Sequence, residues 1–231
     1  MNLLSLYPTK KPDSILLRVV GVTAVMAVVM GLLHLGGDAT RGALLLERDA
    51  VLNGQVWRLA TAHLVNLSGT HTFLNTLGLG LIIVTLWSIL TVETLLRAIM
   101  FSAAAISLGW IVLMPAGVTY VGFSGVTHGV MAWGGLTIWK RGPKWFAVVI
   151  LTCLLAKLGQ EFWNGAVPGA DAAIGGRVSF VSHTLGSLGG TLAAFEGPVL
   201  GRLALLVLCV WLSVIHADRE AASQAESHQD G

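Results

Sequence analysis

The sequence predicts an all-α membrane protein, a bundle of six transmembrane helices followed by a seventh helix at the C-terminal end. Hydrophobic residues make up 55% of the 231 residues and charged residues 11%, whereas a soluble domain carries roughly 25% charged residues. Mean hydropathy is +0.77, and apolar runs of about 20 residues, the length that crosses a bilayer, recur along the chain. The net charge of +2 is too small, and the basic residues too scattered, to indicate nucleic-acid binding.

The expected helices follow the apolar runs at residues 15–35, 70–91, 94–114, 122–140, 144–163, 178–196 and 199–216. The first run follows Lys10 and Lys11 and is longer than the core of a signal peptide, about 7–15 residues, so we expect an anchored helix. The six-helix core covers residues 15–198. The last run is short, and Gly197-Pro198 separates it from its predecessor, so it is the extra helix.

Basic residues orient these helices, because lysine and arginine collect in cytoplasmic loops. With residues 1–14 as a cytoplasmic N-terminus, the cytoplasmic side receives Lys10, Lys11, Arg97, Lys140, Arg141, Lys144 and Arg202. The outer side receives a long loop, residues 36–69, and a second loop, residues 164–177. The second, fourth and sixth helices therefore start at the outer face. The polar tail, residues 217–231, is expected to be disordered.

Four polar residues interrupt the apolar runs near that outer face: Ser124, His183, His71 and Asn75. They lie near the starts of the fourth, sixth and second helices, at a similar depth of about one to two helical turns below the surface. Polar groups at membrane depth are costly and usually face the protein interior, which makes them candidates for function.

Ser124 and His183 indicate nucleophilic catalysis. A serine becomes a good nucleophile when a base takes its proton, and we expect His183 to be that base. No matching acid is evident, because Glu161 and Asp171 are expected in or next to a loop and Glu161 is expected to pair with Lys157. We therefore predict a Ser–His dyad. The alternative for Ser124 alone is a hydroxyl that bonds its own helix backbone.

His71 and Asn75 are four residues apart and share one helix face. Together with the backbone N–H of Ser124 they are expected to form an oxyanion hole, in which several donors aim at one developing negative charge. Their alternative role is in a capping cluster at the start of the helix, with Asn66, Ser68 and Thr70.

Small residues surround both Ser124 and His183. Gly122 and Gly125 flank the serine, Gly129 follows one turn later, and the histidine lies beside a stripe of Ser182, Gly186, Gly190 and Ala194. Small residues let helices approach closely in lipid. The fourth and sixth helices are therefore expected to pack against each other.

Trp57 and Arg58 belong to the long outer loop, which is expected to lie at the membrane interface. Surface anchoring and a functional role are both open for them.

Three sequence blocks, in this order, resemble the rhomboid family of intramembrane serine proteases. They are Trp57-Arg58 followed by His71-x3-Asn75, then Gly122-Phe123-Ser124-Gly125, then His183-x2-Gly186-x3-Gly190. The resemblance covers roughly residues 15–198. It implies a six-helix core, a Ser–His dyad, an oxyanion hole from the histidine and asparagine of the second helix, and no metal or cofactor. It also implies transmembrane substrates that are cut near small or helix-breaking residues.

A narrower resemblance concerns His128, four residues after Ser124, where well-known bacterial rhomboids often carry a tyrosine stacked on the catalytic histidine. This histidine and the stretch from Glu47 to Val65 resemble the rhombosortase branch. The branch implies a bacterial inner-membrane enzyme that processes secreted proteins ending in a Gly-Gly motif, an apolar helix and a basic end. The seventh helix departs from the branch, which usually stops at six.

We therefore expect an intramembrane serine endopeptidase with its active site toward the periplasmic face, and with transmembrane substrates and membrane lipid as its partners. The alternative is an inactive rhomboid-like protein that binds and escorts transmembrane helices, but the presence of both Ser124 and His183 favours the enzyme. A transporter would show intramembrane carboxylates or broken helices in symmetric halves, and a zinc peptidase would show a His-Glu-x-x-His helix. The sequence has neither an internal repeat nor that zinc motif.

Overall fold

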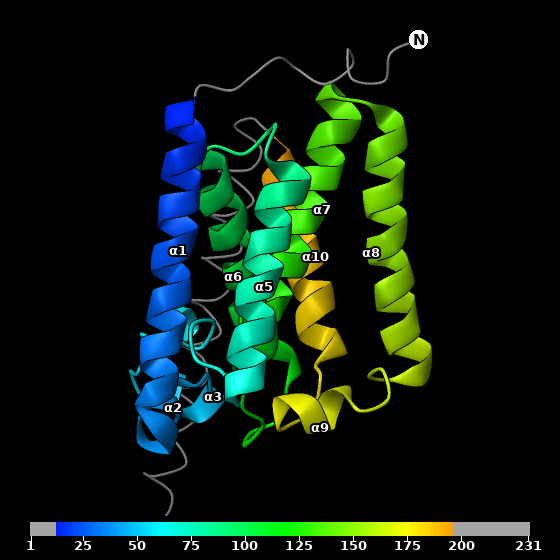
Figure 1. The fold of residues 1–231 in the computed structure, drawn as a ribbon. Coiled ribbons are helices and arrows are strands. Elements are labelled where there is room, and N and C mark those ends of the chain that lie inside the picture. The colour runs from blue at the N-terminus through cyan, green and yellow to red at the C-terminus, as the bar shows by residue number, and fades with distance from the viewer. Residues whose placement is uncertain (1–12, 196–231) are drawn as a thin grey trace, which may run out of the picture.

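The computed structural model describes residues 13–195, and every regular element there is a helix. Six long helices lie side by side (Figure 1): α1 Asp13–Leu35, α5 Gly69–Leu86, α6 Val92–Leu113, α7 Ser124–Arg141, α8 Lys144–Asn164 and α10 Phe180–Ala194. Short helices connect them: α2 Gly37–Leu44, α3 Arg48–Leu52, α4 Arg58–Thr61 and α9 Ala170–Ile174. The all-α prediction is confirmed for this range. The seventh helix and the polar tail lie outside the described residues.

Four helices of the described range are long and apolar enough to cross a membrane, namely α1, α5, α6 and α8. The other two long helices, α7 and α10, lie deeper in the bundle. Nine of the 18 residues of α7 are buried, whereas α1 buries three residues, Val19, Thr23 and Met30. Polar residues in a membrane bundle face its interior, so an enclosed helix carries more of them and is less apolar.

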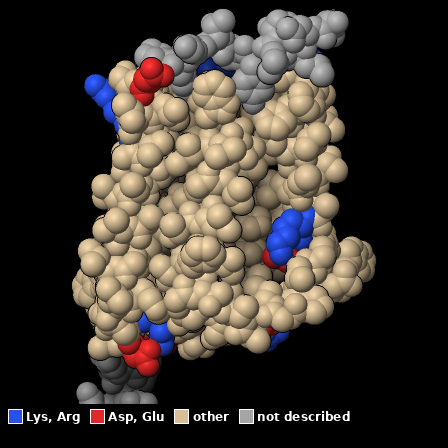
Figure 2. Space-filling model, in the orientation of Figure 1, with Lys and Arg blue, Asp and Glu red and all other residues tan. Residues whose placement is uncertain are grey.

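The surface of the bundle is uncharged along most of its length. On the face drawn in Figure 2, charged residues gather at the two ends and leave an uncharged band between them. One basic group, with acidic atoms behind it, interrupts that band beside α8. The long helices expose large apolar side chains, among them Leu81, Val84, Val112 and Leu155. Such a band suits the hydrocarbon core of a bilayer.

Capping residues move one helix boundary away from its predicted position. The helix expected over residues 70–91 ends at Leu86, because Thr91 starts the next helix. The Thr91 hydroxyl accepts the Thr94 N–H at 3.2 Å, and the Thr94 hydroxyl accepts the Thr91 N–H at 2.9 Å. This reciprocal cap satisfies two free donors at a helix start. The long outer loop predicted over residues 36–69 contains α2, α3 and α4.

Three helices start at the same end of the bundle. The starts of α5, α7 and α10 lie together, where α8 ends (Figure 1). Connecting segments are joined there: Leu46 and Tyr120 exchange two backbone hydrogen bonds of 2.9 Å, and the Gly122 N–H donates to the Ala62 carbonyl at 2.9 Å. The helices predicted second, fourth and sixth therefore start together at one end of the bundle.

Glycines allow α7 and α10 to touch through their backbones. A Cβ on Gly186 would overlap the Gly125 carbonyl, and a Cβ on Gly190 would overlap the Gly129 carbonyl. A Cβ on Gly125 would lie 2.8 Å from the Ser182 carbonyl oxygen. No larger residue fits at these three positions without moving a helix. The predicted close packing of these two helices is confirmed.

Candidate active site

Ser124 and His183 meet at the common end of α7 and α10. The Ser124 Oγ lies 2.9 Å from His183 Nε2, although the residues are 59 positions apart in the sequence. His183 is buried, with 4% of its surface exposed, while Ser124 is partly exposed at the start of α7. The Ser124 hydroxyl is therefore hydrogen-bonded to a basic nitrogen, in a residue that is still partly accessible to another molecule.

Gly122 sets the start of α7. Its φ of +116° is a left-handed conformation, which glycine adopts without a steric penalty. The helix expected over residues 122–140 therefore begins two residues later, at Ser124. The first N–H groups of a helix have no acceptor within it. The N–H of Ser124 is one of these groups.

The carboxylate of Glu161 is a partner of His183 that the sequence analysis missed. Glu161 Oε2 lies 2.7 Å from His183 Nδ1, and Lys157 Nζ lies 2.8 Å from Glu161 Oε1. The expectation that no acid matches His183 is wrong. Glu161 is part of the last turn of α8 and its side chain is 1% exposed, so it turns inward from the helix and does not lie in the following loop.

Glu161 lies on the face of α8 that packs inward. The buried residues of α8 are Ala147, Ile150 and Glu161. At 3.6 residues per turn these three positions fall on one face of a helix. Glu161 continues the inward face of α8, where an ionised carboxylate needs a partner.

His128 covers one face of the His183 ring. The two imidazoles stack with their centroids 4.0 Å apart and their planes at 10°. His128 Nδ1 lies 2.8 Å from the Ser124 carbonyl oxygen, and because a carbonyl only accepts, this nitrogen carries the proton. Although several histidines gather here, residues 13–195 contain no group of three or more His, Cys, Asp or Glu side chains that could hold a metal.

The side chains of His71 and Asn75 face Gly122, two residues before Ser124. A Cβ on Gly122 would lie 3.0 Å from His71 Nε2 and 3.8 Å from Asn75 Nδ2. The Leu67 N–H donates to His71 Nδ1 at 3.3 Å, so the proton of a neutral ring lies on Nε2. Two side-chain donors therefore approach the segment that leads into α7.

Helix capping explains the hydrogen bond of the His71 backbone N–H at the start of α5, but it does not explain the positions of the His71 and Asn75 side chains. Ser68 Oγ accepts the backbone N–H of His71 at 3.1 Å and so caps α5. Asn66 Oδ1 instead accepts from Asn75 Nδ2 at 2.5 Å, which fixes the amide of Asn75. The second amide hydrogen of Asn75 is left for another acceptor.

Trp57 and Arg58 lie away from this group. The Arg58 guanidinium is buried and donates to the carbonyls of Gly42 and Leu45 at 2.8 and 2.7 Å. Trp57 is half exposed, and its Nε1–H donates to the Ala43 carbonyl at 3.2 Å. These contacts join the C-terminal end of α2 to α4 and do not include the serine–histidine pair.

A second serine–histidine pair, Ser107 with His63, has a different geometry. His63 Nε2 lies 2.9 Å from Ser107 Oγ, but that hydroxyl donates its proton to the Leu59 carbonyl at 2.7 Å. It therefore accepts a hydrogen bond from His63 and does not give that ring a proton. Burial lowers the pKa of His63 to about 4, so the ring stays neutral.

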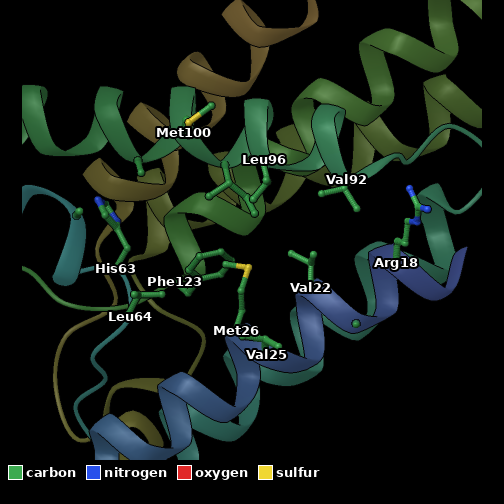
Figure 3. Close-up of a pocket in the computed structure, with 14 residues that line it drawn as sticks. Arg18, Val22, Val25, Met26, His63, Leu64, Val92, Leu96, Met100 and Phe123 are labelled. Carbon is green, nitrogen blue, oxygen red and sulfur yellow. The ribbon is translucent and has the colours of Figure 1, made fainter. Parts of the chain in front are cut away.

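His63 also lines an apolar cavity of about 850 Å³ between α1 and α6 (Figure 3). Arg18 lies at the far end of that cavity from His63, and apolar side chains lie between the two residues. The residues that line this hollow therefore include no serine or cysteine nucleophile. The Ser124 pair is the better candidate for chemistry.

Comparison with known families identifies the class of protein. The Rhomboid domain family matches residues 53–197, which is more than half of the chain and covers α4 to α10. The chain belongs to the rhomboid family. Rhomboids are intramembrane serine proteases, so the predictions of this family, of an integral membrane protein and of a serine endopeptidase are confirmed. No curated protein matches the chain. The stretch that matches the rhomboid domain contains Ser124, His183, His71, Asn75 and Glu161.

Proposed function

We propose that this rhomboid cleaves transmembrane substrates with Ser124 as the nucleophile and His183 as the general base. The observation that carries the proposal is the 2.9 Å contact between Ser124 Oγ and His183 Nε2. The hydroxyl proton moves to Nε2 as Oγ attacks the scissile carbonyl. The proton then passes to the leaving amine, and water releases the acyl group from the serine.

Three donors are available for the oxyanion that forms in this reaction: His71 Nε2–H, Asn75 Nδ2–H and the backbone N–H of Ser124. The two side chains face Gly122, and the N–H belongs to the first turn of α7. Donors that are in place before the reaction stabilise the developing charge without reorganisation. His128 supports the unit, because its ring stacks on His183.

The membrane arrangement that we propose has six spans within residues 13–195, with α7 and α10 added to the four apolar helices, and a cytoplasmic N-terminus. Lys140 and Arg141 lie in the last turn of α7 and Lys144 begins α8, at the end of the bundle where α1 starts (Figure 1). Basic residues collect on the cytoplasmic side. Ser124 then lies toward the outer face, which is the periplasmic face in a bacterial inner membrane.

Within the rhomboids we assign the chain to the rhombosortase branch, on His128 and on residues 47–65. The substrates would then be secreted proteins with a C-terminal Gly-Gly motif, an apolar helix and a basic end. A regular helix hides its carbonyls in its own hydrogen bonds, so a substrate helix must unwind before cleavage. Glycine lowers that cost by about 1 kcal/mol each relative to alanine.

Labelling with a fluorophosphonate, which reacts with activated serines, tests the nucleophile. Wild-type protein in detergent should be labelled, and Ser124→Ala should not. Ser107→Ala is the matched control, because it removes the hydroxyl of the second serine–histidine pair and should keep the label. Equal labelling of Ser124→Ala and wild type would rule out Ser124 as the nucleophile, and a wild type without label would favour the inactive, helix-escorting alternative.

A further inference from the structure

The Glu161 carboxylate is hydrogen-bonded to Nδ1 of His183, the ring nitrogen that does not face Ser124. We propose that Glu161 is a positioning residue that fixes the tautomer and the orientation of His183, so that α7, α10 and α8 each supply one member of a three-residue unit. The inference rests on the proposed function and extends the predicted dyad to a third side chain.

The chemistry of the hydrogen bonds assigns the protons. A carboxylate only accepts hydrogen bonds, so the 2.7 Å contact with Glu161 Oε2 places a proton on His183 Nδ1. A neutral imidazole has one N–H, and Nε2 therefore presents its lone pair to Ser124 Oγ at 2.9 Å. The partner of one ring nitrogen decides what the other nitrogen can do. Without Glu161 the ring is free to carry its proton on Nε2, where it cannot accept one from serine.

Lys157 allows a carboxylate to be ionised at this position. The Glu161 side chain is 1% exposed, and a buried carboxylate without a partner is strongly disfavoured. Lys157 Nζ lies 2.8 Å from Glu161 Oε1 and its side chain is 42% exposed, so the pair is neutral and reaches the surface. Figure 2 shows a basic group with acidic atoms behind it beside α8, within the otherwise uncharged band. The second carboxylate oxygen is left for His183.

The same contact favours the charged form of His183 that arises during the reaction. When the ring takes the serine proton it becomes an imidazolium, and an adjacent carboxylate stabilises that cation. Each donor and acceptor then keeps its partner, with Glu161 on Nδ1 and the reacting oxygen on Nε2. The carboxylate itself does not need to take up a proton.

Other titratable groups surround His183 without competing for Nδ1. His128 from α7 stacks on the ring face, and its own Nδ1 is engaged by the Ser124 carbonyl. His71 from α5 turns its ring toward the segment before α7. Among the described residues, Glu161 from α8 is the hydrogen-bond partner of His183 Nδ1.

The competing interpretation is that the hydrogen bond between Glu161 and His183 is purely structural and only holds α8 against α10. If the role is purely structural, loss of the contact should lower the melting temperature and the folded yield. The protein that still folds should keep the wild-type dependence of kcat on pH. A positioning role predicts a lower kcat with KM nearly unchanged, and a changed dependence of kcat on pH. These readouts separate the two interpretations.

The test compares Glu161→Gln, Glu161→Asp and wild type, all as full-length protein in detergent with a transmembrane reporter substrate. An amide can donate to Nδ1 and so select the other tautomer. We expect Glu161→Gln to lower kcat by about 10²–10⁴-fold, the usual contribution of general acid–base catalysis. The dependence of kcat on pH should change as well, because a neutral amide does not replace the carboxylate beside the ring. Glu161→Asp should recover part of the rate.

Asp38→Asn is the control, since Asp38 is an exposed carboxylate whose ion-pair partner is Arg41. It should match wild type in kcat and in pH dependence. Suppose that Glu161→Gln keeps the wild-type kcat and pH dependence in an assay where Ser124→Ala is inactive. This result would overturn the inference about Glu161 and leave the proposed function in place. Should Glu161→Gln not fold, the position of the proton on the wild-type His183 ring decides between the two interpretations.

A readout that needs no proteolysis makes the test independent of the substrate. ¹⁵N NMR of the histidine rings distinguishes a protonated nitrogen from a bare one, and the His183 signals are those lost in His183→Gln. We expect the proton on Nδ1 in wild type and in Ser124→Ala, and on Nε2 in Glu161→Gln. A wild-type ring with its proton on Nε2 contradicts the inference even if no substrate is cleaved.

Discussion

The Ser124 hydroxyl and the His183 ring form one chemical unit, because a serine needs a base to become a nucleophile. Ser124→Ala and His183→Ala are each expected to reduce cleavage to background. The double variant should be no worse than either single variant, because residues that act as a unit are not additive. Cleavage of a transmembrane reporter measures this, with the melting temperature of each variant as the control for folding. Substantial cleavage by Ser124→Ala would contradict the mechanism.

His71 and Asn75 are expected to differ in importance. Removal of one oxyanion donor lowers the rate of a soluble protease by about 10²–10³-fold. We expect a loss of that size for His71→Ala, whose Nε2 faces Gly122, and a smaller loss for Asn75→Ala, whose amide is shared with Asn66. The measurement is kcat on the reporter substrate.

Ser68→Ala is the matched control for the helix-capping alternative. Ser68 caps α5 through the backbone N–H of His71, and loss of such a cap costs about 1 kcal/mol of stability. We expect a lower melting temperature with kcat unchanged. If His71→Ala and Asn75→Ala behave in the same way, capping is their role and the oxyanion assignment is wrong.

The sequence was sufficient to find some residues of this site and not others. Ser124 and His183 could be singled out because polar side chains stand out in apolar runs and the topology brings their helix starts to one face. Glu161 was hidden because Lys157, four residues earlier, is an obvious partner on the same helix. The inward rotation of α8 gives Glu161 its second contact. That rotation comes from packing between helices, and a local pattern does not fix it.

At the scale of helices, the contact between α7 and α10 determines whether serine and histidine meet. Gly190→Val or Gly186→Val adds bulk where a Cβ already overlaps a backbone carbonyl. We expect activity to fall by about 10²-fold, the effect of a displacement of about 1 Å at an active site, and the melting temperature to fall with it. Gly80→Val is the control, because a Cβ there meets no atom within 4 Å. Wild-type cleavage by both variants would show that the close contact does not position the pair.

The existence of the helices could be predicted more reliably than their ends. The apolar runs in the sequence predicted each long helix, because a helix that crosses lipid needs an apolar surface of nearly fixed length. The ends depended on local contacts, such as the cap of Thr91 that separates α5 from α6 and the left-handed Gly122 that delays α7. The short helices α2, α3 and α4 are held by tertiary contacts, and hydropathy alone does not reveal them.

At the scale of the whole molecule, the candidate site lies at one end of the bundle (Figure 1), and an uncharged band runs between the two ends (Figure 2). A transmembrane substrate is confined to that band, so it must reach Ser124 sideways from the lipid. It must also unwind there, because its carbonyls are otherwise engaged in helical hydrogen bonds. The ease of unwinding near the outer end of the substrate helix is therefore expected to govern which proteins are cut.

A Gly-Gly motif should matter more to cleavage than the basic end that follows the substrate helix. Two glycines lower the cost of unwinding by about 2 kcal/mol relative to alanine, which corresponds to roughly a 30-fold difference in the population of the unwound form. A basic end only anchors the helix at the cytoplasmic surface. We expect Gly-Gly→Leu-Leu in a candidate substrate to lower kcat/KM by at least about tenfold, and removal of the basic residues to lower it less. Equal cleavage of the leucine variant would mean that recognition lies elsewhere and would remove the rhombosortase assignment, while the roles of Ser124 and His183 would stand on their own tests.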